Sequence, residues 1–431
     1  MYKVIIIGGG WSGCAAAISG KKAGADVTLL EKTDLLLGLG NVGGIMRNNG
    51  RFTATEENIA LGAWELFNIT DQCTRHKDVN FPGHKHASLY DVIKVEPYVR
   101  RLLREMDIDV RLMSRAIDVE KSEDDQGEIL VKSIVLAGGE VVEGDVFVET
   151  TGSTGPMGNC LTYGNGCCMC ILRCPSFGPR VSITQKAGRS DIMGMRKDGA
   201  FGAFSGSGKL EKNSLSTEIC NKLDDTGVAI VPIPKQAIVK EKLDLKVCQQ
   251  YALEEFAENI ILLDTGYAKI MTPFFPLDSL RKITGFENAR YVDPYAGGKG
   301  NSIRYLSIAE RDNTMKATGI KNIFCGGEKS GLFVGHTEAI STGSLAGHNA
   351  VRYLKGMKSL ELPISLAIGD LISFANKNLK NEGGLMTRYT FAGAEYFRRM
   401  KEKGLYSIDC EEIKERVNRY GLSGIYNERL I

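Results

Sequence analysis

The sequence predicts an α/β fold: a parallel-sheet domain at the N-terminus, an inserted α+β domain and a short helical C-terminal tail. Three observations predict it. Lys3–Ile7 is short, β-branched and ended by glycines, which is typical of a buried parallel strand. Ala25–Glu31 repeats this pattern after Cys14–Gly24, whose small residues suit a helix lying close on a sheet. Asn322–Cys325 is a further strand pattern, late in the chain and followed by a helix, so the chain is expected to return to the first sheet.

The glycines after the first strand satisfy the pattern G-x-G-x-x-G through Gly8, Gly10 and Gly13. The first permits a tight turn, the second lets the backbone approach a pyrophosphate, and the third lets the helix meet the strand. The helix N-terminus offers free N–H groups and a positive dipole end to phosphate. Glu31 ends the second strand, where a carboxylate can accept both hydroxyls of an adenosine ribose. Together these features predict a Rossmann-like, dinucleotide-binding domain.

Proteins that bind NAD and proteins that bind FAD share this fingerprint, so later segments of the sequence must show which cofactor is bound. Val141–Val148 is a strand pattern that leads into Glu149–Gly152, and this strand followed by T-G resembles the second flavoprotein motif. The strand, loop and helix of residues 322–354 are typical of FAD proteins of the two-dinucleotide type, although an ordinary βα unit has the same pattern. FAD is therefore the predicted cofactor. Its predicted contacts are Gly8, Gly10, Ser12, Gly13, Glu31, Lys32, Thr151, Gly152, Gly327, Glu328, Gly335 and Ala339.

The motifs divide the chain into four expected segments. Residues 1–154 and 301–360 form the two parts of the FAD domain, residues 155–300 the inserted substrate domain, and residues 361–431 the helical tail. We expect an amphipathic helix within Ser88–Met106 that starts near Pro97, and a single strand at Glu140–Val148. Phe81–His86 is expected to form a mobile loop near the flavin. Two helices are expected in the tail, at Tyr396–Lys403 and Glu411–Tyr420.

A cysteine-rich loop is the most unusual feature of the inserted segment. Its five cysteines are Cys160, Cys167, Cys168, Cys170 and Cys174. In one hypothesis Cys167, Cys170 and Cys174 are ligands of a 4Fe-4S cluster, because they match the end of the ferredoxin run C-x2-C-x2-C-x3-C-P. Gly164 stands where the first cysteine of that run is expected. In a second hypothesis Cys174 and Cys170 are redox or nucleophilic thiols near the flavin. In a third the cysteines are incidental, and the three hypotheses stay open.

His336 is the remaining catalytic candidate. The FAD motif around Gly335 places it close to the isoalloxazine, where it could donate a proton or only pack against the ring. Both roles stay open.

At these motifs the chain resembles the glucose-inhibited-division protein A family and its relatives, the folate- and FAD-dependent tRNA uridine methyltransferases. Ile323–Val351 carries most of the resemblance, and Leu280–Arg290 is similar to the stretch L-R-x-I-P-G-L-E-N-A of the methyltransferases. Gly38–Ile45 stands where the family has its G-G-I loop, and Cys174–Ser176 resembles a C-P-S element of the relatives. The resemblance implies an FAD-binding fold.

Two departures bear on function. The relatives carry a cysteine in the loop before G-G-I, and Gly38–Val42 has none. The family also has a long helical C-terminal domain that engages tRNA, whereas about seventy residues follow Leu362 here. The resemblance is therefore extended to the FAD contacts and not to the tRNA chemistry.

Composition limits the classes of function. A net charge of +2 argues against a protein dominated by nucleic-acid electrostatics, and the apolar run after Lys3 is too short to span a membrane. Eleven cysteines without a small-scaffold framework favour reduced thiols and a cytoplasmic location. We expect an FAD-dependent oxidoreductase that moves a hydride or electrons between flavin and a small-molecule substrate or electron-transfer partner. The alternatives are a flavin-dependent tRNA uridine-modifying enzyme and a flavin/iron–sulfur electron-transfer protein. A homo-oligomer is also expected.

Overall fold

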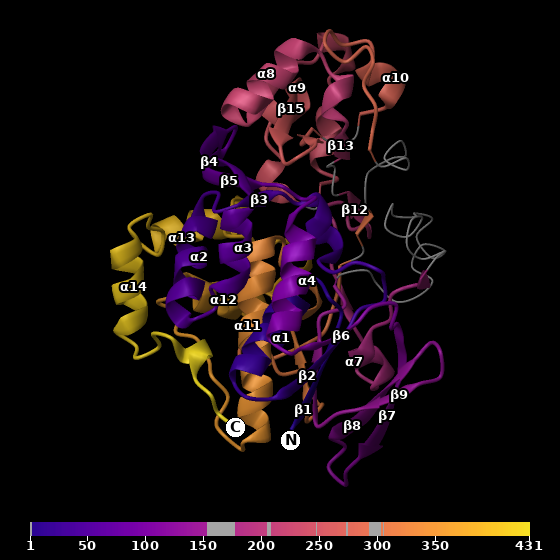
Figure 1. Cartoon of the computed structure of the whole chain (residues 1–431), viewed down its shortest axis with the longest axis vertical. Helices are drawn as coiled ribbons and strands as arrows, with labels where there is room; N and C mark the ends of the chain where they lie inside the picture. The colour runs from indigo at the N-terminus through magenta and orange to yellow at the C-terminus, as the bar shows by residue number, and fades with distance from the viewer. Residues whose placement is uncertain are drawn as a thin grey trace.

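A five-stranded parallel sheet forms the centre of the protein (Figure 1). The computed structural model describes residues 2–152, 177–204, 208–246, 248–272, 275–292, 303–304 and 306–431. The strands follow the order β19 (Ile323–Cys325), β10 (Val146–Glu149), β1 (Lys3–Ile7), β2 (Asp26–Leu30) and β6 (Asp109–Arg111). Because β19 pairs with β10, the chain does return to its first sheet. The predicted fold class is confirmed.

The two faces of this sheet are covered differently, and β1 shows how. Val4 and Ile6 point into a core shared with the helices, whereas Ile5 and Ile7 point into a second core shared with an antiparallel sheet. The antiparallel sheet consists of β7 (Ala116–Glu123), β8 (Ile129–Leu136) and β9 (Val141–Glu143). The alternation of buried side chains explains why β1 has no polar face.

Two helices cross at very short distance on the helical face. These are α1 (Trp11–Lys22) and α11 (His336–Leu354), which lie side by side in Figure 1. A Cβ atom added to Gly343 would lie 2.2 Å from the carbonyl oxygen of Ser12, and one added to Gly347 would lie 2.2 Å from that of Ala16. Only glycine allows this approach, which explains the small residues that the sequence places in both helices.

Further helices complete the layer around α1 and α11. They are α2 (Gly50–Leu61), α3 (Glu65–Gln72), α4 (Val95–Glu105), α12 (Ala367–Asn378), α13 (Ala394–Glu402) and α14 (Cys410–Asn418). The carboxylate of Glu57 accepts the backbone N–H groups of Ala367 and Ile368 and so caps α12 from inside α2. None of the helices in the described part of the chain has the length and apolar character needed to cross a membrane.

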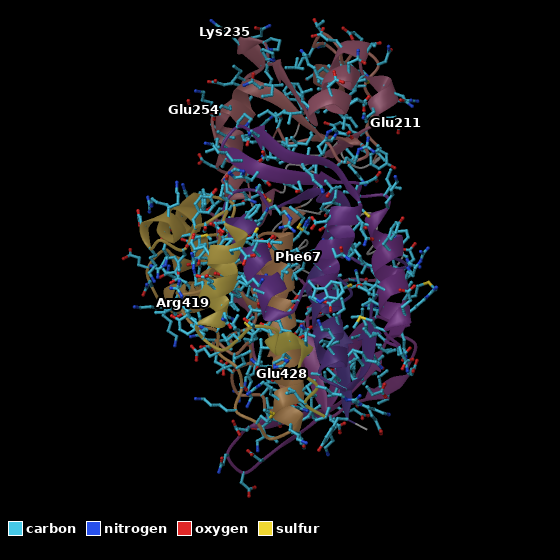
Figure 2. The ribbon with its side chains drawn as sticks, turned by 60° about the vertical axis from the view of Figure 1, so that its left-hand side comes forward. Phe67, Glu211, Lys235, Glu254, Arg419 and Glu428 are labelled. Carbon is cyan, nitrogen blue, oxygen red and sulfur yellow. The ribbon has the colours of Figure 1, made fainter. Side chains whose placement is uncertain are left out.

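A second unit stands at one end of the molecule (Figures 1 and 2), with Glu211, Lys235 and Glu254 on its outer surface. Its antiparallel sheet is ordered β13 (Gly208–Leu210), β16 (Ala268–Ile270), β15 (Asn259–Asp264) and β14 (Val228–Pro232). Helices α8 (Thr217–Thr226), α9 (Glu255–Glu258) and α10 (Leu277–Leu280) accompany it, and α7 (Ile183–Lys186) lies beside β7. Two short pairs, β11 (Ile192–Met193) with β18 (Ser307–Ile308) and β12 (Ala203–Phe204) with β17 (Ile303–Arg304), connect this region to the first unit.

The second unit is held to the first by a three-stranded sheet from early in the chain. This sheet consists of β3 (Ile45–Met46), β4 (Thr74–Phe81) and β5 (His84–Tyr90). Phe81 and Leu89 are buried in one cluster with Ile261 and Leu263 of β15. The apolar contact fixes the second unit over the first. The predicted boundaries at residues 154/155 and 300/301 lie outside the described residues and stay predictions.

Two local expectations are wrong. Glu140–Val148 is not one strand, because Gly144 separates β9 from β10 and the two belong to different sheets. Phe81–His86 is the tip of the β4–β5 hairpin and not a mobile loop, with Gly83 at φ +74° in its turn and the His84 side chain buried. The helix expected within Ser88–Met106 to start near Pro97 is confirmed: α4 begins at Val95, two residues before Pro97, and Ser88–Tyr90 before it belongs to β5. The two predicted tail helices correspond to α13 and α14.

The helix crossing gives a testable prediction. Gly347→Ala forces a methyl group against the backbone of α1 and is expected to lower the free energy of unfolding by about 1–3 kcal/mol. Gly20→Ala is the matched control in α1, because its added Cβ meets Val27 at an ordinary 3.5 Å. The control should be neutral or stabilise by up to about 1 kcal/mol, since alanine is the better helix former. Urea unfolding of both variants checks this, and equal stabilities would contradict it.

Candidate functional site

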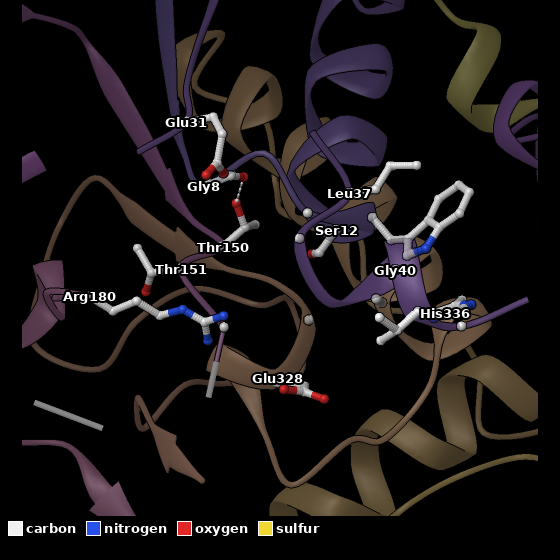
Figure 3. Close-up of a pocket in the computed structure, with 18 of the residues that line it drawn as sticks. Gly8, Ser12, Glu31, Leu37, Gly40, Thr150, Thr151, Arg180, Glu328 and His336 are labelled. Atoms are coloured by element: carbon white, nitrogen blue, oxygen red, sulfur yellow. Dashed lines mark hydrogen bonds between the residues drawn. The ribbon is translucent and has the colours of Figure 1, made fainter. Parts of the chain in front are cut away.

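A cavity lies beyond the carboxyl ends of β1, β2 and β10 (Figure 3), where ligands bind in open parallel sheets. Its empty volume is about 1520 Å³, including the space at its open mouth. All the predicted cofactor contacts except Gly13 line it. The structure therefore brings residues from the first, middle and late parts of the sequence to one place.

The glycine loop has the geometry that its pattern predicts. Gly8 has φ +107°, and an added Cβ would lie 2.5 Å from the carbonyl oxygen of Thr150. Thr150 in turn donates a hydrogen bond of 2.7 Å from its hydroxyl to the Gly8 carbonyl, as drawn in Figure 3. Gly13 does not line the cavity because it lies behind this loop, where its Cβ would be 1.8 Å from the Gly8 oxygen. Its role is the close contact of helix and strand.

The N-terminus of α1 presents unused hydrogen-bonding capacity to the cavity. The Ser12 hydroxyl is buried and has no hydrogen-bond partner among the described residues. The N-cap residue is Gly10, which has no side chain to cap this helix end, and Gly10, Trp11 and Ser12 all line the cavity. Buried polar groups are normally satisfied, and an orphaned hydroxyl at a positive helix end fits an anionic ligand such as a phosphate.

Glu31 is held in place by its own backbone neighbourhood. One carboxylate oxygen accepts the Gly9 N–H at 2.7 Å, and the other accepts the N–H and the hydroxyl of Thr33, both at 2.8 Å. An ionised carboxylate has about four acceptor positions, so one remains for a ligand in the cavity. Lys32 also lines the cavity, and its ammonium donates to the Gly178 carbonyl at 2.7 Å.

Two arginines on the cavity wall were not among the predicted contacts. Arg180 reaches toward the space between Thr151 and Glu328 in Figure 3. Arg115 lines the same wall and donates to the Pro179 carbonyl at 3.3 Å. Their two positive charges suit a diphosphate. No sequence motif identifies these two arginines. Arg115 directly precedes β7 and Arg180 lies in a loop, and the two segments meet only in the folded chain.

His336 lies on the side of the cavity opposite Glu31 (Figure 3). It is the first residue of α11, its ring centroid lies 5.6 Å from that of Trp11, and its Nδ1 lies 3.2 Å from the Tyr90 hydroxyl. Burial raises the pKa of Tyr90, so this hydroxyl stays protonated. A Cβ on Gly43 would lie 1.7 Å from His336 Cε1, so the loop at Gly43 lies directly against the imidazole.

The second unit closes this end of the cavity. Cys248, Gln250, Tyr251 and Lys269 line it, and sequence analysis found none of them. The Gln250 side-chain oxygen is buried and has no partner among the described residues, so it too offers an unused acceptor. The thiol of Cys248 is the only one in the described part of the chain that lines the cavity. No spacing signal could have found these residues, because only the docking of β15 and β16 places them here.

Two buried bases stand behind this wall. His84 Nε2 lies 3.0 Å from the Gln250 carbonyl, and its Nδ1 lies 2.9 Å from the Asn48 amide. Burial lowers the pKa of His84 to about 3, so the imidazole is neutral, with Nε2 as donor. Lys246 donates to the Met271 carbonyl at 2.7 Å, and burial lowers its pKa to about 7. Both residues support the segment that carries Cys248 and Tyr251.

A buried ion pair joins α2 to the start of α11. The Arg51 Nε lies 3.1 and 3.2 Å from the two carboxylate oxygens of Glu338, which also accept from the hydroxyl of Thr390 and the N–H of Phe391. Burial alone lowers the pKa of Arg51, but the Glu338 carboxylate raises it above its ordinary value. Arg51 also lines the cavity, and Glu338 lies in the first turn of α11 after His336. The pair therefore fixes the cavity wall at the start of α11.

The cysteine-rich loop lies outside the described residues, so the structure places none of its cysteines Cys160, Cys167, Cys168, Cys170 and Cys174. Within the described ranges, no group of three or more His, Cys, Asp or Glu side chains could hold a metal ion. The 4Fe-4S hypothesis therefore has no support from the structure. The thiol role of Cys174 and Cys170 stays a prediction.

Comparison with known proteins assigns the family. The sequence model described as "Glucose inhibited division protein A" matches residues 3–259 and 265–358. The chain belongs to this family. Its members are FAD-dependent enzymes, so the resemblance seen in the sequence is confirmed.

Individual relatives agree with this assignment. A methylenetetrahydrofolate–tRNA-(uracil-5-)-methyltransferase, TrmFO of Caldicellulosiruptor bescii, is 30% identical over 141 residues, which cover 32% of this chain and 28% of that enzyme. The match thus spans less than a third of the relative's length. Two crystal structures of GidA from Aquifex aeolicus superpose with TM-scores of 0.63 and 0.62 at 15% identity. The superpositions cover 97% of this chain and 76% and 78% of those chains, and they show a shared fold.

The cavity fits the cofactor of the family. It offers an acidic ribose ligand in Glu31, a glycine loop with an orphaned Ser12 hydroxyl for phosphate, and a further polar compartment around His336. A dinucleotide needs these features in this order, from adenosine through pyrophosphate to the second ring system.

Removing the charge of Glu31 tests the adenosine end. Glu31→Gln leaves a weaker acceptor and points an amide group at the Gly9 or Thr33 donors. We expect the affinity for FAD to fall about ten- to hundredfold, which corresponds to about 1–3 kcal/mol, with the fold retained. Titration of the apoprotein with FAD measures it. Glu123→Gln, on an exposed strand, is the control, and an unchanged dissociation constant for Glu31→Gln would remove Glu31 from the site.

The buried ion pair gives a stability prediction. Arg51→Met leaves the Glu338 carboxylate buried without its counter-ion and should lower the free energy of unfolding by about 3–5 kcal/mol. Arg398→Met is the control, since Arg398 is 71% exposed and its pair with Glu402 spans one helix turn. This control should change stability by no more than about 0.5 kcal/mol. Denaturant unfolding compares them, and a wild-type midpoint for Arg51→Met would disprove the role of the pair.

Proposed function

We propose that this protein is an FAD-dependent enzyme that modifies uridine bases in tRNA. The observation that carries the proposal is the family match, which extends through residues of both units that line the cavity. It covers Gly8 and Glu31 at one end and Cys248 and His336 at the other. A relative with detectable sequence identity is named as a tRNA uracil methyltransferase. This reading replaces the small-molecule oxidoreductase that the sequence alone favoured.

The residues that would hold FAD follow from the cavity. Glu31 would accept one ribose hydroxyl with its remaining acceptor position. The N-terminus of α1 with Ser12 and the guanidinium of Arg180 would hold the pyrophosphate, and the ring system would occupy the end around His336. When bound, FAD supplies two-electron redox chemistry that no side chain can perform. The N-terminus of α11, which begins at His336, directs its positive end to this compartment.

The protein's own residues would prepare the substrate side. Tyr251 and Gln250 form a wall that excludes water from the ring compartment, and His84 and Lys246 hold that wall from behind. Cys248 lines the same cavity, and its thiol would act as the nucleophile toward a base. His336 and the protonated Tyr90 hydroxyl could hold or pass a proton at the opposite wall.

An FAD-dependent oxidoreductase acting on a small molecule is the second candidate. The specific observation that favours it is the loop Gly38–Val42, a 3-10 helix that lacks the cysteine of the tRNA-modifying relatives. In that case the ring compartment would accept a free substrate, and RNA would not be needed. The expected homo-oligomer stays a prediction for either candidate.

Binding and nucleoside analysis test the function. The purified FAD-loaded protein should retain tRNA on a filter, with an affinity that falls steeply as salt rises, because phosphate contacts release counter-ions. Deletion of the gene in its host should remove one modified uridine from total tRNA, detected by mass spectrometry of nucleosides. Protein that turns over a small substrate but neither retains tRNA nor changes its nucleosides would establish the second candidate and contradict the first.

Cysteine variants test the substrate side of the same site. Cys248→Ser should lower the yield of modified uridine at least a hundredfold, with the FAD content unchanged, since a serine hydroxyl is a far weaker nucleophile than a thiolate. Cys220→Ser is the matched control, because Cys220 is partly buried in the second unit and does not line the cavity. Equal activity of both variants would exclude Cys248 from the reaction.

A further inference from the structure

Gln250 carries an unpaired amide oxygen on the cavity wall that the second unit forms. The residue lies in the short 3-10 helix η5 (Gln249–Tyr251), is 4% exposed and lines the cavity. Its side-chain oxygen Oε1 is buried and has no hydrogen-bond partner among the residues that the structure describes. A buried acceptor without a donor is unfavourable, so such an atom normally has a partner. A ligand in the cavity can supply the missing donor.

The base of this side chain is fixed by two other segments. The backbone carbonyl of Gln250 accepts the Nε2–H of His84 at 3.0 Å, and His84 Nδ1 lies 2.9 Å from the Asn48 amide. A Cβ atom added to Gly393 would lie 2.6 Å from the Gln250 Cβ, so the loop before α13 packs directly against the side chain. Because its backbone and Cβ are held in place, the amide loses little further freedom when it binds a ligand.

The chemistry of the amide limits what it can bind. A glutamine side chain offers an acceptor oxygen and, beside it, a nitrogen with two N–H donors. The complement of this pair is a flat group with an N–H next to a carbonyl oxygen. The imide edge of a uracil ring has this pattern, and so does the pyrimidine part of a flavin ring, because in both rings an N–H stands between two carbonyl groups.

We propose that Gln250 is a specificity-determining residue that binds the imide edge of a ring in this compartment. Oε1 accepts the ring N–H, and Nε2 donates to the neighbouring carbonyl oxygen. A site of this kind rejects a ring that lacks the N–H, because the amide is then left unpaired. For a uracil the inference rests on the proposed function, and it then places base recognition two residues after Cys248, in a segment that lines the same cavity. For the flavin it rests on FAD binding alone.

The next residue in the chain offers a matched control. Gln249 has the same side chain in the same 3-10 helix and is partly buried, but it does not line the cavity. Its Nε2 donates to the Met386 carbonyl at 3.4 Å. Gln249→Ala therefore removes an identical group from the same segment and leaves the cavity wall unchanged.

The test compares ligands with and without the ring N–H. Apoprotein is titrated with FAD and with FAD methylated at ring N3. FAD-loaded protein is titrated with uridine 5′-monophosphate and with its 3-methyl derivative, followed by the change in flavin absorption. In one of the two titrations, wild type should bind the unmethylated form at least tenfold more tightly. Gln250→Ala removes the amide and leaves room for the methyl group, so it should bind both forms equally, whereas Gln249→Ala should keep the wild-type preference.

Gln250→Met separates recognition of a ligand from support of the fold. Methionine is nearly as long as glutamine and has no amide, so this change removes an unpaired acceptor from the wall. The thermal midpoint of the apoprotein should stay at the wild-type value or rise. A lower midpoint or failure to fold would overturn the proposal, because the amide would then serve the fold.

The two titrations also separate the two rings. A preference for FAD over its methylated form assigns the amide to the flavin, and a preference for uridine 5′-monophosphate assigns it to uracil. No preference in either titration, or the same preference in Gln250→Ala as in wild type, would overturn the proposal. Filter retention of tRNA is measured on the same preparations. Wild type that retains tRNA but shows no preference refutes only this inference, and wild type that prefers unmethylated FAD but does not retain tRNA refutes only the proposed function.

Discussion

The close crossing of α1 and α11 is the constraint on which the site depends. Gly343 and Gly347 allow the backbones to touch, and this contact aligns the two helix N-termini so that both open into one cavity. One N-terminus carries Ser12 and the other carries His336. A larger residue at the crossing would separate the ends that face the two halves of a dinucleotide. The Arg51–Glu338 pair then fixes the start of α11, so packing and electrostatics determine the same geometry.

The parts of the fold that could be predicted are those that a pattern of consecutive residues indicates. The turn at Gly8, the acid at Glu31 and the late strand at Ile323–Cys325 each follow from local pattern, and the structure brings them together. The wall formed by Tyr251 and its neighbours could not be predicted, because it depends on the docking of β15 on β5 through apolar contacts that have no spacing rule. The prediction of a single strand at Glu140–Val148 was wrong for a similar reason: the close approach of Gly144 to Ile5 is a tertiary contact.

The preference for a small-molecule oxidoreductase rested on two departures from the family, the absence of a cysteine in Gly38–Val42 and the short segment after Leu362. The family match nevertheless extends over most of the chain. The folded protein shows why such an argument is weak. Cys248, from a distant segment, lines the same cavity as the loop that lacks a cysteine, so the absence of a thiol from one loop does not show that the cavity has none.

The return of the chain to its first sheet also affects how the protein is made. The apolar face of α1 is covered by α11, which begins only at residue 336, and β10 gains its outer neighbour β19 at residue 323. At about 5–20 residues per second, a ribosome takes tens of seconds to reach this point. During that time the nascent first domain exposes an apolar helix surface and an unpaired strand edge, both of which favour aggregation. The yield of folded protein in cells should therefore rise at low growth temperature, or with chaperones that bind the early part of the chain until α11 has been synthesised.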